Sequence, residues 1–319
     1  MRAFVADPDA ALGLALCEVD EPRPGPGRAV VAVHATSLNR GEVLHVQKYR
    51  MLAAGAVPGW DVAGVIVAAA TDGAGPAVGT PVFGFSPERG TWAPRVTVAV
   101  DHLAALPEGL SMSDAATLGI AACTALRALD HLGRPLAGSS VLVTGATGGM
   151  GAFAVQLAGL GGALPTAVLR SDASPEQACE MFGPTVAVEC GLDPDGPPAD
   201  LIVDAIGGAV LTAALQRVGN DGTVVSLGRT DDTAATLPSG WFHKNARLHG
   251  LTVTRAYAET GSAAAALATL GGLAADGRLS TNVGAILDRT QLLDGVRMLL
   301  DRKVSGKVVV RWNADGECG

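Results

Sequence analysis

The pattern of apolar and polar residues changes in character near residue 118. Before that point, short apolar runs are interrupted by glycine and proline, and we interpret these runs as strands. Their close spacing predicts a compact, partly antiparallel, barrel-like domain with strands at residues 29–33, 62–68, 80–85 and 93–98.

After residue 118, apolar runs alternate with stretches at helical spacing. Repeated strand–helix units predict a parallel, doubly wound sheet that binds its ligand at the carboxyl ends of the strands. The predicted strands cover residues 141–143, 166–169, 185–188, 200–205 and 223–227, with a possible edge strand at 248–253. A last strand at 306–311 is expected to return to the first domain, so the predicted domains are 118–255 and 1–117 with 256–319.

A glycine-rich turn joins the strand at 141–143 to an apolar helix that starts at residue 151. Without Cβ atoms, such a turn lets backbone N–H groups approach a pyrophosphate, and the helix N-terminus adds partial positive charge. The spacing Gly-x-x-Gly-x-x-Gly differs from the commonest fingerprint, but the strand before it and the helix after it provide the required context. The predicted cofactor-binding residues of the turn are Gly145, Thr147, Gly148, Gly149, Met150 and Gly151.

The residue that follows the second strand of such a sheet contacts the ribose of the cofactor and distinguishes a 2′-hydroxyl from a 2′-phosphate. Here it is Arg170, followed by Ser171, which favours the 2′-phosphate of NADPH. Asp172 is a counter-signal, because a carboxylate there accepts hydrogen bonds from the ribose of NADH. The structural alternative for Arg170 is a solvated surface charge.

Composition narrows the class of protein. The chain has 319 residues, 48% of them hydrophobic, and a formal net charge of -8, which argues against nucleic acid as a partner. No apolar run reaches membrane-spanning length and no secretory leader is recognisable, so we expect a cytoplasmic protein without a membrane partner. The five cysteines are scattered without a Cys-x-x-Cys pair, and we interpret most of them as small apolar fillers.

Several short strings, taken in order, resemble the medium-chain dehydrogenase/reductase superfamily and its zinc-independent quinone oxidoreductase branch. They lie at residues 37–42, 58–65, 79–84, 204–208 and 306–307. The resemblance spans essentially the whole chain. It implies a Rossmann cofactor domain and a β-rich, GroES-like catalytic domain.

Zinc members of this superfamily place a cysteine in the loop that corresponds to residues 38–42, and a Gly-His-Glu where this chain has Gly59, Trp60 and Asp61. Catalytic zinc requires three protein ligands. The resemblance therefore implies an enzyme without a metal, in which Trp60 and Asp61 shape the substrate pocket. A buried structural carboxylate is the alternative for Asp61.

The resemblance also suggests catalytic residues. Asn39 corresponds to an Asn close to the nicotinamide or the substrate, where its amide can donate to a carbonyl that gains negative charge; Glu42 occupies the place of its acidic partner. Asn39 equally suits the cap of a short helix at residues 40–46. Tyr49 corresponds to a proton donor of related enoyl reductases, although an amphipathic side chain at a domain edge explains it as well.

Further candidates follow from the predicted sheet. Gly207 and Gly228 end two strands where the nicotinamide half of the cofactor is expected. Thr124, near a helix start, is a candidate for the nicotinamide side or for helix packing. Lys244 and Lys307 are weaker candidates for binding anions, since most lysines are solvated surface residues.

Together these features predict hydride transfer from NADPH to a conjugated acceptor, a quinone or an α,β-unsaturated carbonyl. The alternatives are an enoyl reductase for a specialised, polyketide-like intermediate and a protein that binds NADPH without turnover. An exposed edge strand at 248–253, together with the resemblance, suggests a homodimer.

Overall fold

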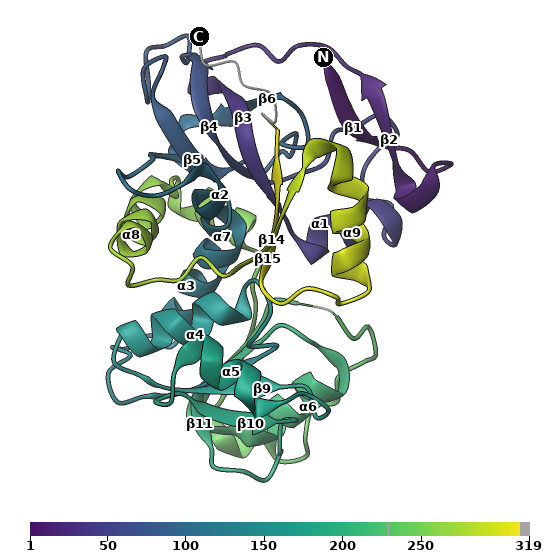
Figure 1. Ribbon diagram of the computed structural model, residues 1–319. Helices are drawn as coiled ribbons and strands as arrows, with labels where there is room; N and C mark the ends of the chain where they lie inside the picture. Colours follow the sequence, from purple (N-terminus) through teal and green to yellow (C-terminus); the bar gives the residue numbers. More distant parts are fainter. Residues whose placement is uncertain (229, 313–319) are drawn as a thin grey trace. The chain divides into compact units, whose positions relative to one another are not determined.

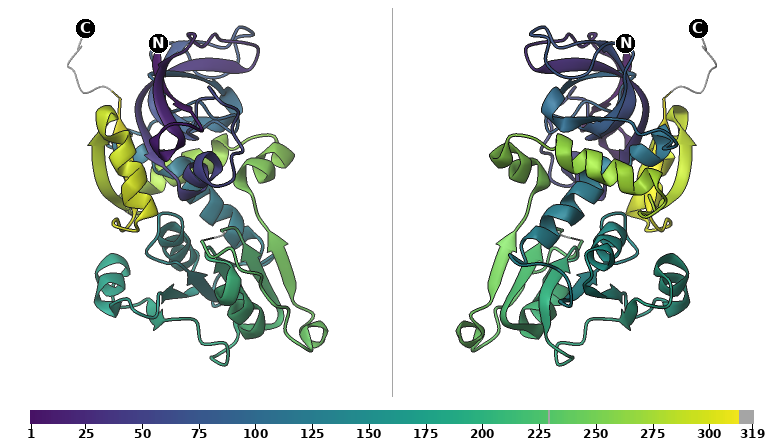
Figure 2. Two further views of the ribbon diagram at one scale, coloured as in Figure 1. Left: turned by 90° about the vertical axis from the view of Figure 1, so that its right-hand side faces the viewer. Right: turned by 90° about the vertical axis from the view of Figure 1, so that its left-hand side faces the viewer.

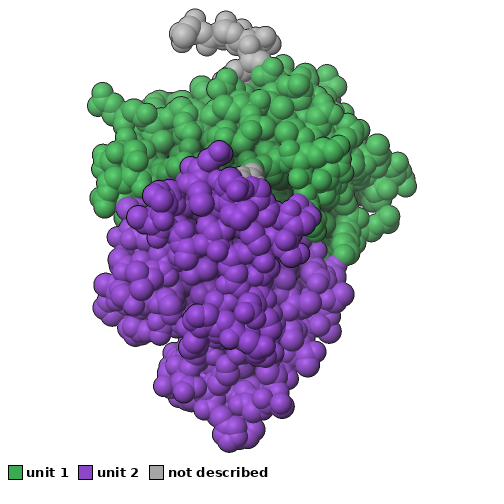
Figure 3. Space-filling view, turned by 60° about the horizontal axis from the view of Figure 1, so that its bottom comes forward, with its two compact units in different colours: residues 1–123, 257–319 green, residues 124–256 purple. Residues whose placement is uncertain are grey.

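A computed structural model describes residues 1–228 and 230–312 (Figure 1). The chain divides into two compact units, which are coloured separately in Figure 3. Unit 1 comprises residues 1–123 and 257–319, and unit 2 comprises residues 124–256. The predicted fold class, a parallel doubly wound sheet domain beside a β-rich domain, is confirmed.

The sheet of unit 2 has six strands in the order β10-β9-β8-β11-β12-β13, and every neighbouring pair is parallel. The strands are β8 (Ser140–Thr144), β9 (Leu164–Leu169), β10 (Ala187–Cys190), β11 (Ala199–Asp204), β12 (Val218–Ser226) and β13 (Arg247–Gly250). From β8 the chain adds β9 and then β10 on one side of the sheet. It then returns to the other side of β8 and adds β11, β12 and β13. This is the strand order of dinucleotide-binding folds, with its switch point between β8 and β11.

Helices connect these strands because the sequence returns to helical spacing between the apolar runs. They are α4 (Gly151–Leu160), α5 (Pro175–Phe182) and α6 (Gly208–Arg217), with α3 (Cys123–Asp130) leading into the unit. In β8, Val141 and Val143 on one face are fully buried and Leu142 on the other face is 3% exposed, as expected for a strand covered on both faces. Helix α4 is buried along most of its length, so the glycine turn is held between two core elements.

Unit 1 contains a seven-stranded mixed sheet and a separate two-stranded one. The larger sheet runs β14-β15-β3-β4-β5-β7, with β6 paired to β3. Its strands are β3 (Arg28–Leu38), β4 (Asp61–Ala68), β5 (Pro81–Phe85), β6 (Arg95–Ala99), β7 (Leu103–Ala105), β14 (Val283–Asp288) and β15 (Lys307–Arg311), while β1 (Arg2–Ala6) and β2 (Leu14–Glu18) form the small sheet.

The helices of unit 1 lie at the ends and faces of these strands. They are α1 (Arg40–Gln47), α2 (Met112–Ala115), α8 (Ala264–Ala275) and α9 (Leu292–Leu300), together with a wide π-helical turn at Leu118–Ala122. Helix α7 (Val253–Thr260) contains the boundary between the units. Among the described residues, no helix has the length and apolar character needed to cross a membrane.

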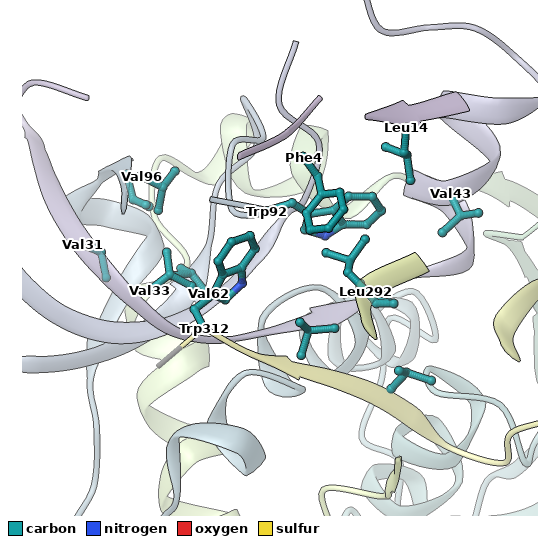
Figure 4. Packing of buried hydrophobic residues seen from close by; sticks show 14 of the residues in the cluster. Phe4, Leu14, Val31, Val33, Val43, Val62, Trp92, Val96, Leu292 and Trp312 are labelled. Atoms are coloured by element: carbon teal, nitrogen blue, oxygen red, sulfur yellow. The ribbon is translucent and has the colours of Figure 1, made fainter. Parts of the chain in front are cut away.

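The core of unit 1 joins residues near the start of the chain with residues of its last described strand. Strand β15 pairs antiparallel with β3, which confirms the predicted return of residues 306–311 to the first domain. Figure 2 shows the yellow C-terminal segment that contains this strand from two sides. Phe4 and Trp312 meet edge to face with ring centroids 6.4 Å apart, and Trp92 is fully buried in the same cluster (Figure 4). Aromatic side chains from distant segments therefore close this core.

Several local predictions were wrong. The strand predicted at 248–253 ends at Gly250, and Val253 begins helix α7, because the short apolar run there fits either element. Strand β14 was not predicted, and β10 lies two residues beyond its predicted position. Of the cysteines within the described residues, only Cys123 is buried, while Cys17, Cys179 and Cys190 are exposed and are not core fillers; Cys318 lies outside that part of the chain.

Candidate functional site

The glycine turn of unit 2 depends on the absence of side chains at two positions. Gly145 adopts φ +62°, which favours glycine, and its carbonyl accepts the Gly148 N–H at 2.9 Å. A Cβ on Gly151 would lie 2.3 Å from the Gly145 carbonyl oxygen, so any side chain there would displace the start of α4. No side chain of the described residues caps α4, which leaves the turn suited to an anion.

A buried hydrogen-bond network ties this turn to the end of β11. The Thr144 hydroxyl donates to Asp204 Oδ1 at 2.7 Å, and it accepts the Ala205 N–H at 3.0 Å. Asp204 Oδ2 accepts the Gly207 N–H at 2.9 Å. Burial raises the pKa of Asp204, while these donors oppose the shift. The carboxyl ends of β8 and β11 are thus locked together at the switch point of the sheet.

The two other predicted glycines of unit 2 lie at this same edge. Gly207 has φ +85° and immediately precedes α6. A Cβ on Gly228 would lie 2.2 Å from the carbonyl oxygen of Ala205, so this residue holds the end of β12 against the end of β11. The structure therefore brings the glycine turn, Gly207 and Gly228 to one edge of the sheet.

Arg170 and Ser171 follow β9 directly, as predicted, and both are exposed. The Arg170 guanidinium forms an ion pair with Asp172 at 3.2 Å, and the two side chains are 60% and 71% exposed. Such an exposed pair contributes little stability, so Arg170 is available to a stronger anion.

Two further candidates lie elsewhere in unit 2. Thr124 is buried at the start of α3. Lys244 donates to the carbonyl oxygens of Gln216 and Val218 at the end of α6.

The polar centre of unit 1 is the carboxylate of Asp61, which is fully buried at the start of β4. Its Oδ2 accepts the Ser37 hydroxyl at 2.5 Å and the Asn39 amide at 2.8 Å. Its Oδ1 accepts the Ile120 N–H at 2.6 Å, from the π-helical turn. A carboxylate with these donors is an organising group of the fold, which agrees with the structural alternative considered for Asp61.

Lys307 supplies the positive charge of this cluster. Its ammonium donates to Asn39 Oδ1 at 2.6 Å and to the Leu38 carbonyl at 3.4 Å, and it lies 3.5 Å from Asp61 Oδ2. The residue is 2% exposed. The solvated surface lysine that we considered as the alternative to an anion-binding role is therefore excluded for Lys307. Its burial follows from the pairing of β15 with β3, in which Val308 faces Leu38.

Glu42 completes the cluster from the first turn of α1. One carboxyl oxygen accepts the Asn39 N–H at 2.6 Å, and the other accepts the Trp60 N–H at 2.9 Å. Burial, reinforced by the nearby charge of Asp61, raises the pKa of Glu42 to about 8. At neutral pH Glu42 is then protonated, so that the single negative charge of Asp61 faces the single positive charge of Lys307.

Asn39 lies where these groups meet. It occupies the N-cap position of α1, as one of its two predicted roles required. One amide hydrogen is taken by Asp61, whereas the contact with Glu42 Oε1 is long, at 3.4 Å. The second amide hydrogen is therefore only weakly engaged, and Asn39 itself is half-buried.

Next to this cluster, aromatic and basic side chains gather around His45 of α1. The rings of His45 and Trp60 meet edge to face with centroids 5.4 Å apart, and the rings of His45 and Tyr49 meet edge to face with centroids 6.3 Å apart. The Arg89 guanidinium lies over the Trp60 ring at 5.8 Å. Tyr49, Trp60, His45 and Arg89 thus lie in one group. Arg89 was not recognised from the sequence, because the loop that carries it has no motif of its own.

The donor set of unit 1 does not suit a catalytic zinc ion. Where zinc members of the resembling family carry ligands, the carboxylate oxygens of Asp61 and Glu42 already accept hydrogen bonds, and an ammonium lies among them. Within residues 1–228 and 230–312, no group of three His, Cys, Asp or Glu side chains has an arrangement that could hold a metal. The glycine turn of unit 2, by contrast, fits a dinucleotide.

Two family models match the chain. The model described as alcohol dehydrogenase GroES-like domain covers residues 25–108, and the model described as zinc-binding dehydrogenase covers residues 184–310. The first match lies within unit 1. The second covers the second half of unit 2 and part of unit 1.

Individual proteins are also similar. A mycocerosic acid synthase-like polyketide synthase of Mycobacterium tuberculosis is 32% identical over 265 residues, which is 79% of this chain but 12% of that protein. The crystal structure of an NAD-dependent alcohol dehydrogenase is 25% identical with a TM-score of 0.83, and covers 98% of this chain and 100% of its own. The CurK enoyl reductase, 21% identical with a TM-score of 0.83 over 97% of this chain and 98% of its own, shares the fold.

Proposed function

Because the chain belongs to the medium-chain dehydrogenase/reductase superfamily, we propose that it is a zinc-independent, NADPH-dependent reductase of a quinone or an α,β-unsaturated carbonyl. The observation that carries this proposal is the glycine turn at the switch point of a parallel sheet, where only glycine fits at Gly151. In this proposal residues 118–255 form the dinucleotide-binding domain, and residues 1–117 with 256–319 form the catalytic domain.

Unit 2 contributes the residues that hold the cofactor. Backbone groups of the turn from Gly145 to Gly151 bind the pyrophosphate, and Arg170 exchanges Asp172 for the 2′-phosphate, assisted by the Ser171 hydroxyl. Gly207, Gly228 and Thr124 line the nicotinamide half. When bound, NADPH supplies the hydride equivalent that the protein itself lacks.

Unit 1 contributes the groups that act on the acceptor. The weakly engaged amide hydrogen of Asn39 donates to the acceptor oxygen as negative charge develops there. Lys307 and Asp61 hold the Asn39 amide in place, and neutral Glu42 adds no opposing negative charge. Because a conjugated acceptor delocalises the arriving charge, one such donor is sufficient. Tyr49 is the proposed proton donor to the product, and Trp60 forms a wall of the pocket.

A more specialised activity is also proposed, the reduction of an enoyl group in a polyketide-like intermediate. The sequence identity of 32% to the polyketide synthase of Mycobacterium tuberculosis supports it, because the two solved structures reported above are 25% and 21% identical. Since the chain spans only 12% of that protein, the activity of the whole synthase is not transferred. A bulky enoyl thioester would then be reduced faster than a simple quinone.

The test is oxidation of NADPH and NADH, followed by absorbance, with quinones, small enones and an enoyl thioester. We expect a preference for NADPH that falls roughly 10- to 100-fold in Arg170→Ala, because a charge-assisted contact with the 2′-phosphate is lost. Arg134→Ala is the matched control, since Arg134 is also an exposed arginine of unit 2 in a surface ion pair. An unchanged preference in Arg170→Ala would exclude the role of Arg170, and binding of NADPH without turnover of any acceptor would exclude the reductase.

A further inference from the structure

We propose that Arg89, together with His45 and Trp60, forms an anion-binding subsite that takes a carboxylate carried by the substrate. The inference rests on the proposed function for the nature of the reaction, but the subsite is assigned from contacts within unit 1. It predicts that the preferred acceptor is a conjugated carbonyl compound with an acidic group rather than a neutral quinone.

The position of the Arg89 side chain is set by its loop. The Arg89 N–H donates to the Ser86 carbonyl at 3.0 Å, and the Ser86 hydroxyl donates to the Arg89 carbonyl at 2.7 Å. Between these bonds Arg89 adopts φ +74°, a left-handed conformation that favours glycine. A long charged side chain is thus placed on a strained but firmly held backbone, as occurs at ligand-binding sites.

The Arg89 guanidinium packs against the side chains of Trp60 and His45. It lies over the Trp60 ring at 5.8 Å, and the Trp60 backbone is in turn fixed by its hydrogen bond to Glu42. The Arg89 Nη2 atom lies 3.4 Å from His45 Nδ1. Since arginine can only donate, Nδ1 must be the acceptor and the imidazole proton must be on Nε2. Burial, and then the charge of Arg89, lower the pKa of His45, which keeps this imidazole neutral.

The charge of Arg89 is left uncompensated. Among the residues that the structure describes, Arg89 forms no ion pair with a carboxylate, and its Nε atom is buried without a hydrogen-bond partner. This is unexpected in a chain with 31 acidic and 23 basic residues. A half-buried guanidinium without a carboxylate is stabilised when an anion binds beside it.

A carboxylate fits this subsite for two reasons. A planar carboxylate matches the Nη1 hydrogens of the guanidinium and the Nη2 hydrogen that is not directed at His45. The apolar face of Trp60 and the ring of Tyr49 provide a surface for the carbon chain between the carboxylate and the acceptor carbonyl. The chain of contacts from Arg89 through Trp60 and Glu42 to Asn39 connects this subsite with the proposed donor to the carbonyl.

The test compares two acceptors, an enone with a carboxylate several methylene groups away and its methyl ester. The variants are Arg89→Gln and Arg89→Gly. The second suits φ +74° and therefore keeps the fold even if the first does not. We expect KM for the acid to rise roughly 10- to 100-fold in both variants, because a charge-assisted contact is lost, while kcat/KM for the ester stays within about twofold. Arg95→Gln, which changes an exposed arginine paired with Glu21, is the control.

An equal effect on acid and ester, no effect on either, or a raised KM for NADPH instead would overturn the subsite. If the wild-type protein reduces neither acceptor, the proposed function fails, and calorimetric titration with hexanoate and hexanamide decides the subsite alone. Binding of hexanoate that is lost in Arg89→Gly, with hexanamide not bound, supports it. Absent hexanoate binding, or binding that persists in Arg89→Gly, overturns it.

Discussion

The two units build their candidate sites in opposite ways. In unit 2 the glycine turn is made of backbone, and its residues lie close together in the sequence, from Gly145 to Gly151. In unit 1 the site is made of side chains, and Asn39, Asp61 and Lys307 are separated by 22 and 246 residues. The site of unit 2 depends on the absence of a Cβ atom at its glycines. The site of unit 1 depends on charges and hydrogen-bond donors that are paired with one another.

This difference changes how each site should respond to mutation. An added side-chain atom displaces a backbone turn, and the effect stays local because the packing of the neighbouring strands does not change. A buried polar cluster fails when a group is removed, because each remaining charge or donor loses its partner in a medium that does not solvate it. The predictions below test this contrast.

The largest effect is expected from Lys307→Met, which leaves the buried Asp61 carboxylate without its cation. Breaking such a pair costs about 3–5 kcal/mol. Urea unfolding followed by tryptophan fluorescence measures it, because three of the four tryptophans, Trp60, Trp92 and Trp312, belong to unit 1. Lys303→Met, at a residue with a 70% exposed side chain, is the control.

A double-mutant cycle sharpens this result. Asp61→Asn removes the charge that Lys307 compensates, so the double variant should lose clearly less stability than the sum of the two single changes. Strict additivity, or a Lys307→Met protein as stable as Lys303→Met, would show that the cluster does not act as a unit.

The next effect is expected from Gly151→Ala in unit 2. The added Cβ would meet the Gly145 carbonyl oxygen at 2.3 Å, so the start of α4 must move and NADPH affinity should fall roughly tenfold or more. Gly159→Ala in the same helix is the matched control, since its Cβ would lie 3.9 Å from Pro165. That change should stabilise α4 by about 1 kcal/mol and leave affinity unchanged, as measured by fluorescence titration. Equal affinities of the two variants would contradict the model of the turn.

Glu42 should make the stability of unit 1 depend on pH. Its pKa is raised to about 8 in the folded protein, so between the ordinary pKa of glutamate and pH 8 the folded state holds a proton that the unfolded chain has released. Stability is therefore fully present at low pH and falls as pH rises through this window, with a slope of at most about 1.4 kcal/mol per pH unit.

Glu42→Gln imitates the protonated form and should remove this slope, whereas Glu108→Gln at an exposed residue should retain it. Unfolding in urea at a series of pH values from 5 to 9 gives the comparison. The same slope in both variants would mean that Glu42 is not the group that titrates.

The smallest effect concerns an edge of the sheet in unit 2. Within the described part of the chain β13 pairs only with β12, and Leu248 in it is 48% exposed. If this edge pairs with its copy in a homodimer, Leu248→Lys should shift the mass from light scattering toward the monomer without changing stability by more than about 0.5 kcal/mol. Leu164→Lys, at a 66% exposed residue of β9, should not do so, and a monomeric wild type at micromolar concentration would contradict the dimer.

The sequence by itself determined the elements whose causes are local. The glycine turn, its flanking strand and helix, the alternation of strands and helices in unit 2, and Arg170 directly after β9 all follow from side-chain patterns within a few residues. The short helix capped by Asn39 belongs to the same class, because Glu42 lies three residues on in the capping position. Where two local patterns fitted equally, as at residues 251–253, the prediction was wrong.

Only the tertiary structure decided the chemistry of unit 1. The sequence indicated Lys307 only as a weak candidate for binding anions, yet the pairing of β15 with β3 buries its ammonium between Asn39 and Asp61. Nothing in the residues near Arg89 indicates that its guanidinium lies against His45 and Trp60 without a carboxylate. A charge acquires its function from the groups that surround it and from the water that is excluded, and in this unit those groups come from segments far apart in the chain.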